Sequence, residues 1–283
     1  MRGHVDVWAN DERTTVEGYT THWITERAIA EIERQHTTRP DDPFFVVVAH
    51  AAVHKPLQGP DDPPLRRYGA PWKFPTDHDP RRSYRAMIDE LDASVGELVG
   101  CLERLDIANE TLFVFFSDNG ALEHGSNGPL RGFKGHLLEG GHRVPAIVAW
   151  PGRVRAGTSD AFVTSLDWMP TLLELAGATL PPNHHLDGLD VGSHLFAGNA
   201  LPTRRFFWSF HKQIAVRDGT TKLLGTFSVD GKQKRFELHD LALDPGEADN
   251  LSDEARDRVG ELSNAHRAWL RDVLDGATPQ PGR

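Results

Sequence analysis

The stretch TLFVFFSDNG, residues 111–120, decides the fold. Its first half, residues 112–116, is an uninterrupted apolar run that is long enough for a strand and too short for a helix. A strand that is apolar on both faces favours the middle of a sheet covered by helices. The run ends in residues 117–120, which carry side-chain oxygens or favour turns. Because ligands of open α/β sheets bind beyond the carboxyl ends of the strands, we expect a binding site here.

Asp118 and Asn119 supply oxygen atoms of the kind that Ca²⁺ or Mg²⁺ prefers. In a straight strand the two side chains would face opposite ways, so both reach one ion only where the backbone breaks. Gly120 would permit such a break. The alternative is an ordinary turn, because Asp, Asn and Gly favour turns in any protein.

A long glycine-rich loop follows and ends near Pro145, before the next apolar run. Loops of this length that return to a strand are more often functional than filler. Within it, Lys134 is a compact positive charge suited to a phosphate or sulfate oxygen. The competing interpretation is a solvated surface lysine.

Upstream, the pattern predicts a strand–helix–strand unit from residues 44–49, 84–105 and 111–117. His50 and His54 follow the first of these strands. A spacing of four aligns metal ligands only on a helix, so this pair does not indicate a metal site.

The character of the chain changes at residue 205, where short strands surround the turns Asp218-Gly219 and Asp230-Gly231. A final amphipathic helix is expected over residues 252–274. We therefore predict a main domain over residues 1–204 and a smaller antiparallel subdomain with a terminal helix over residues 205–283.

The composition is that of an ordinary globular protein, with 39% hydrophobic and 25% charged residues among 283. A net charge of −10 argues against general binding to nucleic acid or anionic membranes. Cys101 is the single cysteine, which excludes an internal disulfide. The chain shows neither a secretory signal nor a run of about 20 apolar residues. As written it is expected to be cytoplasmic, although a longer parent protein could be exported.

Several motifs in order resemble the sulfatase family, of the arylsulfatase type and the alkaline-phosphatase-like superfamily: PFFVVVAHAAVHKPLQGP, YRAMIDELDASVGELVGCLERL, SDNG, GSNGPLRGFKG, EGGHRVP, AWPG, LDWMPTLLELAG, DGLD, AVRDGTTKLL and ELHDLALDPGEADNL. The resemblance covers about residues 18–251. It implies an α/β fold with a mostly parallel sheet flanked by helices and truncated at its N-terminus, and a smaller C-terminal antiparallel subdomain.

The resemblance also implies roles for single residues. Asp118 and Asn119 would hold Ca²⁺, with Mg²⁺ as the alternative ion. Lys134 would contact a sulfate oxygen or the leaving oxygen, and His54 would bind the substrate and donate a proton to the leaving alcohol. Without the resemblance, His54 is more simply a hydrogen-bonded loop histidine. The expected substrate is a small sulfate ester or a sulfated glycan.

The family's nucleophile is a formylglycine made from the Cys or Ser of a C/S-x-P-x-R motif, and no such motif occurs in these 283 residues. The family's N-terminal pair of metal-binding aspartates is missing too. Two ligands leave Ca²⁺ under-coordinated, because it takes six to eight oxygens. We therefore expect a fragment with little activity alone, whose partner is a missing N-terminal half or a second copy.

Two alternatives stay open at this point. Sulfate and phosphate oxyanions use the same metal, lysine and histidine, so a phosphodiesterase or phosphonate monoester hydrolase of the same superfamily is the enzymatic alternative. A non-catalytic remnant or a partner-binding subunit is the other. The sequence carries no signature of a particular substrate.

Overall fold

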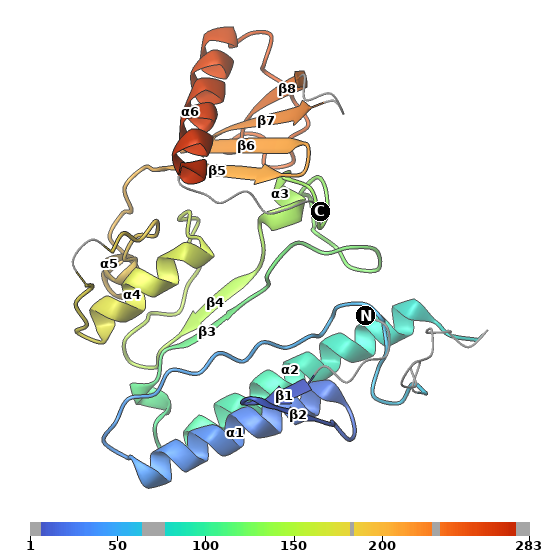
Figure 1. Cartoon of the computed structure of the whole chain (residues 1–283), viewed down its shortest axis with the longest axis vertical. Coiled ribbons are helices and arrows are strands. Elements are labelled where there is room, and N and C mark those ends of the chain that lie inside the picture. The colour runs from blue at the N-terminus through green and yellow to red at the C-terminus, as the bar shows by residue number, and fades with distance from the viewer. Residues whose placement is uncertain (1–6, 64–76, 182–183, 228–232, 276–283) are drawn as a thin grey trace. The chain divides into compact units, whose positions relative to one another are not determined.

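The computed structural model describes residues 7–63, 77–181, 184–227 and 233–275 (Figure 1). The chain divides into two units, residues 1–113 and 114–283, and each is described by itself. The domain boundary predicted between residues 204 and 205 stays a prediction.

Two long helices dominate the first unit. It contains a short antiparallel pair, β1 (Val7–Ala9) and β2 (Glu12–Thr14), followed by α1 (Thr20–Thr38), α2 (Pro80–Arg104) and the 3₁₀ turn η1 (Ala108–Glu110). The start of α2 is fixed by Asp79, whose carboxylate accepts the backbone N–H groups of Arg81 and Arg82, and by Pro80. The helix predicted over residues 84–105 is thus confirmed, one turn longer at its start.

The core of the first unit lies between these helices. Its buried side chains come from α1 and α2, namely Ala28, Ile32, Leu98, Cys101 and Leu102. Cys101 is fully buried, as expected for a small apolar residue in a helix stripe.

Residues 44–49 lie along this core, but they do not form the predicted strand. Their side chains alternate as in a strand: Phe44, Val46 and Val48 pack on the core, whereas Phe45 and Val47 are 72% and 73% exposed. No neighbouring strand is paired with them in the described part of the chain. The predicted strand–helix–strand unit is therefore incomplete, because a strand needs a hydrogen-bonded neighbour and residues 44–49 have none among the described residues.

The two strands that flank the glycine-rich loop, β3 (Phe113–Phe116) and β4 (Ala146–Ala149), form a two-stranded sheet (Figure 1). Just beyond them, Ser117 N–H donates to Pro145 O at 3.4 Å and Gly120 N–H to Gly141 O at 2.9 Å. From the first of these hydrogen bonds to the second, the residue number rises from 117 to 120 after β3 and falls from 145 to 141 before β4. The two segments therefore run antiparallel. The sequence predicted a mostly parallel sheet; this one described pair runs antiparallel, and the connection over residues 117–145 is long enough for either direction.

Three short helical elements follow β4, namely η2 (Ser165–Asp167), α4 (Trp168–Leu175) and α5 (Gly192–Ala197). Asp167 is fully buried at the η2–α4 junction and accepts the N–H groups of Thr164 and Leu189 at 2.7 and 2.9 Å. Both terminal nitrogens of Arg204 donate to this carboxylate at 2.6 Å. The Asp167 side chain does not cap α4; it closes the η2 turn through the Thr164 N–H and fixes the chain on both sides of α5.

The acid dependence of stability follows from this pair. Burial alone opposes ionisation of Asp167, but the bonds from Arg204, Leu189 and Thr164 outweigh it and lower its pKa. This stability is present above the unfolded pKa of about 4 and is lost as pH falls through the folded pKa. Asp167→Asn should lower the free energy of unfolding by about 2 kcal/mol at pH 7 and less near pH 3, in urea titrations. An equal loss at both pH values would contradict this; the exposed Asp253→Asn is the control.

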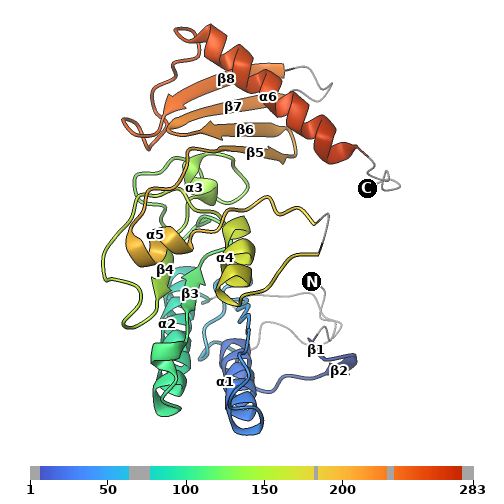
Figure 2. The same cartoon turned by 90° about the vertical axis from the view of Figure 1, so that its left-hand side faces the viewer.

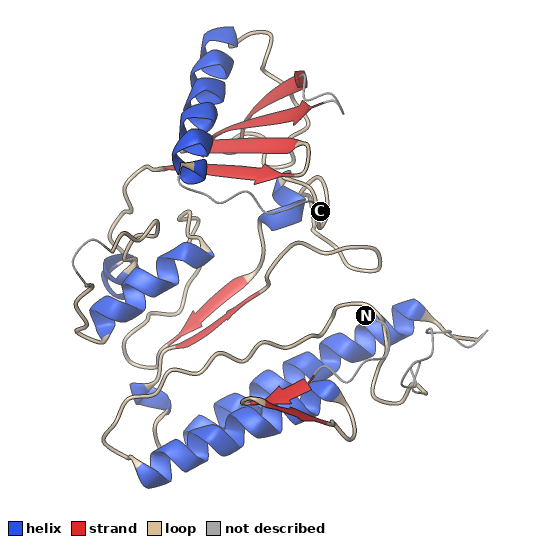
Figure 3. Cartoon of the chain, viewed as in Figure 1, coloured by secondary structure: helices blue, strands red, loops and turns tan. Residues whose placement is uncertain are grey.

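The C-terminal sheet is antiparallel in the order β5 (Arg205–Phe210), β6 (Gln213–Asp218), β7 (Thr221–Phe227) and β8 (Gln233–Asp240). Helix α6 (Arg256–Leu274) packs on one face of it (Figures 2 and 3). The core between them consists of Val216, Leu223, Leu238 and Leu262. The predicted C-terminal subdomain of an antiparallel sheet and a terminal helix is confirmed.

The predicted turn at Asp218-Gly219 joins β6 to β7, with Asp218 paired to Thr221 and Gly219 at φ +61°. The turn predicted at Asp230-Gly231 lies outside the described residues. Among the described helices, none combines the length and the apolar character that crossing a bilayer requires.

Candidate functional site

The end of β3 carries the two residues predicted to bind a cation. Asp118 is exposed and Asn119 is half-buried. Ser117 Oγ donates to Asn119 O at 2.9 Å, which folds the backbone over at this point. The oxygens of Asp118 and Asn119 thus lie where the strand ends, and their role as cation ligands stays a prediction.

Gly120 is required here, but for a different reason from the expected one. Its φ does not lie in the left-handed region. A Cβ at this position would overlap the carbonyl of Gly140, because the two backbones pass in contact. Glycine therefore serves close packing of the strand end on the segment Gly140-Gly141.

The first half of the glycine-rich loop is closed back onto the strand end. Asn127 Oδ1 accepts the Ala121 N–H at 2.7 Å, and its Nδ2 donates to Ala121 O at 3.3 Å and Gly132 O at 3.1 Å. Lys134 N–H also donates to Ala121 O, at 3.2 Å. These bonds bring Lys134 back beside the residues that directly follow Asp118 and Asn119.

Lys134 is half-buried, and among the described residues no carboxylate lies within ion-pair distance of it. The ammonium group is therefore not neutralised by a neighbour in the described part of the chain. A half-buried cation in a backbone-fixed loop is suited to an anionic ligand.

His54 belongs to the first unit and is described there alone. It is exposed, and its Nδ1–H donates to the Lys55 carbonyl at 2.8 Å. Because a carbonyl only accepts, this contact fixes the tautomer, and Nε2 carries a proton only when the ring is charged. Nearby, burial lowers the pKa of His50, whose ring nitrogens have no hydrogen-bond partner among the described residues.

Asp118 and Asn119 are the side chains expected to hold a calcium ion. No group of three or more His, Cys, Asp or Glu side chains converges in the described ranges. A carboxylate and an amide are the right kind of donor for Ca²⁺, but two donors fall short of six to eight. The described residues thus do not complete a calcium site.

A buried ion cluster lies behind the loop, and no pattern in the sequence predicted it. Lys222 on β7, Glu139 at the start of α3 (Glu139–His142) and Glu247 are all fully buried. Lys222 Nζ lies 2.8 Å from Glu139 Oε1 and 2.9 Å from Glu247 Oε1. Glu247 Oε2 accepts the Glu139 backbone N–H at 2.6 Å. Three buried charges therefore join the loop to the C-terminal sheet.

Two pKa shifts describe the electrostatics of this cluster. Burial alone would raise the pKa of Glu139, but the adjacent Lys222 outweighs it and holds the pKa below its usual value. Burial, followed by the Lys222 charge, lowers the pKa of His142 to about 4. His142 is therefore neutral at pH 7, and its Nε2 lies 3.1 Å from Lys222 Nζ and 3.2 Å from Leu137 O.

The glycines after Glu139 serve the same attachment. A Cβ on Gly140 would lie 2.6 Å from Arg131 O and 2.5 Å from Gly132 O, and one on Gly141 would overlap His136 O. The second half of the loop thus wraps directly over the α3 backbone. Local sequence could not reveal this, because Lys222 sits in an ordinary alternating strand pattern and its partners lie far away in the chain.

Two protein-family models match this chain. A family model described as Sulfatase matches residues 3–178, which include the β3 end and the glycine-rich loop. The chain belongs to the sulfatase family. A second model, described as "N-sulphoglucosamine sulphohydrolase, C-terminal", matches residues 133–265, including Lys134 and the antiparallel sheet.

Individual sulfatases agree with this assignment. The chain is 35% identical over 208 residues to an arylsulfatase of Hemicentrotus pulcherrimus, covering 71% of this chain and 35% of that protein. It is 31% identical over 265 residues to a sulfatase of Formosa agariphila, covering 82% and 47%. The chain thus spans about a third to a half of the length of these curated relatives.

Solved structures give the same α/β fold. The crystal structure of Ps i-CgsB matches with a TM-score of 0.78 and 28% identity, covering 92% of this chain and 56% of that one. The same protein in complex with k-i-k-neocarrahexaose matches equally well, at a TM-score of 0.78 and 27% identity. The α/β class expected for this sulfatase-family chain is confirmed.

Proposed function

We propose that the chain is part of a sulfuric ester hydrolase of the arylsulfatase type and holds the sulfate group of the substrate. The observation that carries this is the bond from Lys134 N–H to Ala121 O, which returns an unneutralised lysine to the end of β3. A lysine near Asp118 and Asn119 suits an anionic sulfate ester, whose oxygens also attract a metal ion.

In this proposal each side chain has one task. Lys134 pairs with a sulfate oxygen or the leaving oxygen and offsets the charge that builds up there. His54, in the first unit, is assigned substrate binding and protonation of the leaving alcohol from Nε2, since its Nδ1–H is held by the Lys55 carbonyl. Asp118 and Asn119 contribute two oxygen donors for Ca²⁺, with Mg²⁺ as the alternative.

The rest of the catalytic machinery must come from another segment. Members of this family generally use a metal ion and a formylglycine, and these 283 residues hold no C/S-x-P-x-R motif from which formylglycine is made. We propose that one complementary segment supplies the nucleophile and the remaining metal ligands.

The exposed apolar side chains support a complementary segment. In the first unit Phe45 and Val47 are 72% and 73% exposed, and in the second Ile147 on β4 is 60% exposed. Side chains of this size in strand-like segments are normally covered. We propose that an N-terminal sulfatase half covers them, and a second copy of the chain is the alternative.

We propose a sulfated glycan as substrate, with a small sulfate ester as the alternative. The support is that a related structure, Ps i-CgsB, was solved in complex with k-i-k-neocarrahexaose. With a net charge of −10, the chain is not expected to take nucleic acid as a partner.

The purified chain should turn over little or no 4-nitrophenyl sulfate in Ca²⁺, because it lacks the nucleophile. It should bind Ca²⁺ with a Kd weaker than about 1 mM by calorimetry, since two donors are too few.

Co-expression with a segment that carries C/S-x-P-x-R should restore turnover. Rapid hydrolysis by the chain alone would contradict the proposal, and faster cleavage of the matched phosphate or phosphonate ester would favour the superfamily's other hydrolases.

A further inference from the structure

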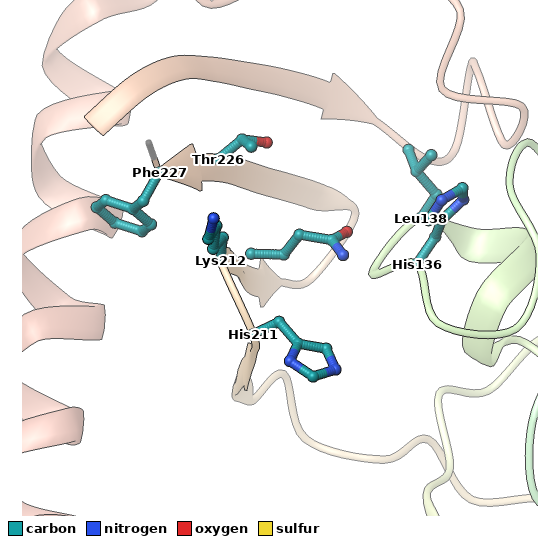
Figure 4. A pocket seen from close by; sticks show the side chains of 7 residues that line it. His136, Leu138, His211, Lys212, Thr226 and Phe227 are labelled. Atoms are coloured by element: carbon teal, nitrogen blue, oxygen red, sulfur yellow. The ribbon is translucent and has the colours of Figure 1, made fainter. Parts of the chain in front are cut away.

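A pocket of about 530 Å³ lies at the edge of the C-terminal sheet, within the second unit (Figure 4). One wall comes from the glycine-rich loop and the other from the β5–β6 turn and the ends of β6 and β7. The lining side chains are His136, Leu138, His211, Lys212, Gln213, Thr226 and Phe227. Figure 4 shows His136 and Leu138 on the loop side, and His211 and Lys212 on the sheet side.

The two walls are tied to each other, so the pocket is formed before any ligand binds. The Gln213 side chain donates from Nε2 to Gly135 O at 3.1 Å and accepts the Leu137 N–H at Oε1, at 3.3 Å. Phe227 N–H donates to Lys212 O at 2.8 Å, which fixes the β7 end to the turn. A preformed pocket loses little entropy when a ligand enters.

The lining is cationic in a chain with ten more acidic than basic residues. No carboxylate is among the seven lining residues, whereas one lysine and two histidines are. Lys212 and His211 are exposed, and within the described ranges no carboxylate lies within ion-pair distance of Lys212. Their N–H groups are therefore free to donate to an anionic group.

The remaining lining is suited to a sugar ring. Phe227 and Leu138 offer apolar surface, while Thr226 and Gln213 offer polar groups that fix orientation. His136 also follows Lys134 by two residues in the loop, so their Cα atoms are at most about 7 Å apart. Lys134 and the loop wall of the pocket are therefore close together, as a ligand of two neighbouring sugar units requires.

We infer that this pocket binds a second anionic substituent of a glycan substrate, on a sugar unit next to the one whose ester is cleaved. The inference rests on the proposed function for the identity of the first sulfate, but the anion site itself does not depend on it. Lys212 is a specificity-determining contact here, and His211 and His136 assist it.

The test compares two probes by calorimetry or amide-shift titration of the full chain: a disaccharide with one sulfate on each ring, and the same disaccharide with a single sulfate. Lys212→Ala should lower the disulfated-to-monosulfated affinity ratio about tenfold, as expected for one charge-assisted hydrogen bond. His211→Asn should lower it less, and asparagine tolerates the backbone of this position at φ +51°. Arg256→Ala, which removes a positive charge from exposed α6, is the matched control.

An unchanged ratio in Lys212→Ala would overturn the inference. Lys134→Ala should weaken both probes in parallel, because it acts on the sulfate they share. If Lys134→Ala left both affinities unchanged while Lys212→Ala still lowered the ratio, the proposed function would fail and the anion pocket would stand. In 1 M salt the Lys212 effect should disappear, because exposed charges are screened over about 3 Å.

Discussion

Replacing Lys222 with methionine should lower the free energy of unfolding by about 3–5 kcal/mol. Methionine fills similar space but leaves the fully buried carboxylates of Glu139 and Glu247 without the charge that lies 2.8 and 2.9 Å from them. Urea unfolding at pH 7, followed by circular dichroism, would measure this. A change below about 1 kcal/mol would show that the pair contributes no more than a surface ion pair.

The pH dependence of the Lys222→Met effect separates charge loss from poor packing. In the wild type, Glu139 has a lowered pKa, so its contribution is lost as pH falls below the unfolded value near 4.5. In the variant, the two buried carboxyl groups are more stable in the protonated, neutral form. The loss of folding free energy in the variant is therefore smaller at low pH. The gap between the two proteins should therefore narrow from pH 7 to pH 4. Lys212→Met, at an exposed position, should change stability by less than about 0.5 kcal/mol.

Lys134→Ala should lower kcat about 10²- to 10³-fold in an enzyme reconstituted with the segment that carries the nucleophile. The reason is that Lys134 would offset charge on the sulfate or leaving oxygen, and no other cation of the described loop is bonded to the same backbone turn. Steady-state hydrolysis of an aryl sulfate, with kcat and KM measured separately, provides the test.

A matched variant tells a catalytic lysine from a structural one. Lys134→Arg keeps the charge and should recover part of kcat. The midpoint of urea unfolding should be the same in both variants as in the wild type, because Lys134 is only half-buried. If Lys134→Ala changed KM alone, the side chain would bind the ground state and transition state equally. Unchanged kcat and KM would remove Lys134 from the proposed site.

The features that the sequence predicted depend on short-range patterns. The apolar stripe of α2, the burial of Cys101 and the turn at Asp218-Gly219 are fixed by neighbours a few residues away, and the structure agrees. The strand over residues 44–49 failed because a strand also needs a partner, which a local pattern does not specify. Gly120 was expected for its backbone freedom, yet close approach to Gly140 explains it.

The candidate site could be predicted only in part for the same reason. Asp118, Asn119 and Lys134 lie close in sequence, and the loop bonds confirm that the chain returns to the strand end. The cluster unites residues that are far apart in the chain. Lys222 lies 83 positions after Glu139, and Glu247 lies 108 positions after it. Nothing near Lys222 distinguishes it from a solvated lysine, so only the fold reveals it.

That cluster also constrains how such chains can be recombined. A chimera with its crossover between His142 and Lys222 would take Glu139 from one parent and Lys222 from the other. A chimera whose C-terminal parent lacked a lysine opposite Glu139 would leave this buried carboxylate with the more distant Arg143 and Arg217, at 3.7 and 3.5 Å. Exchanges of the C-terminal sheet should therefore succeed only between parents that share both ends of this contact.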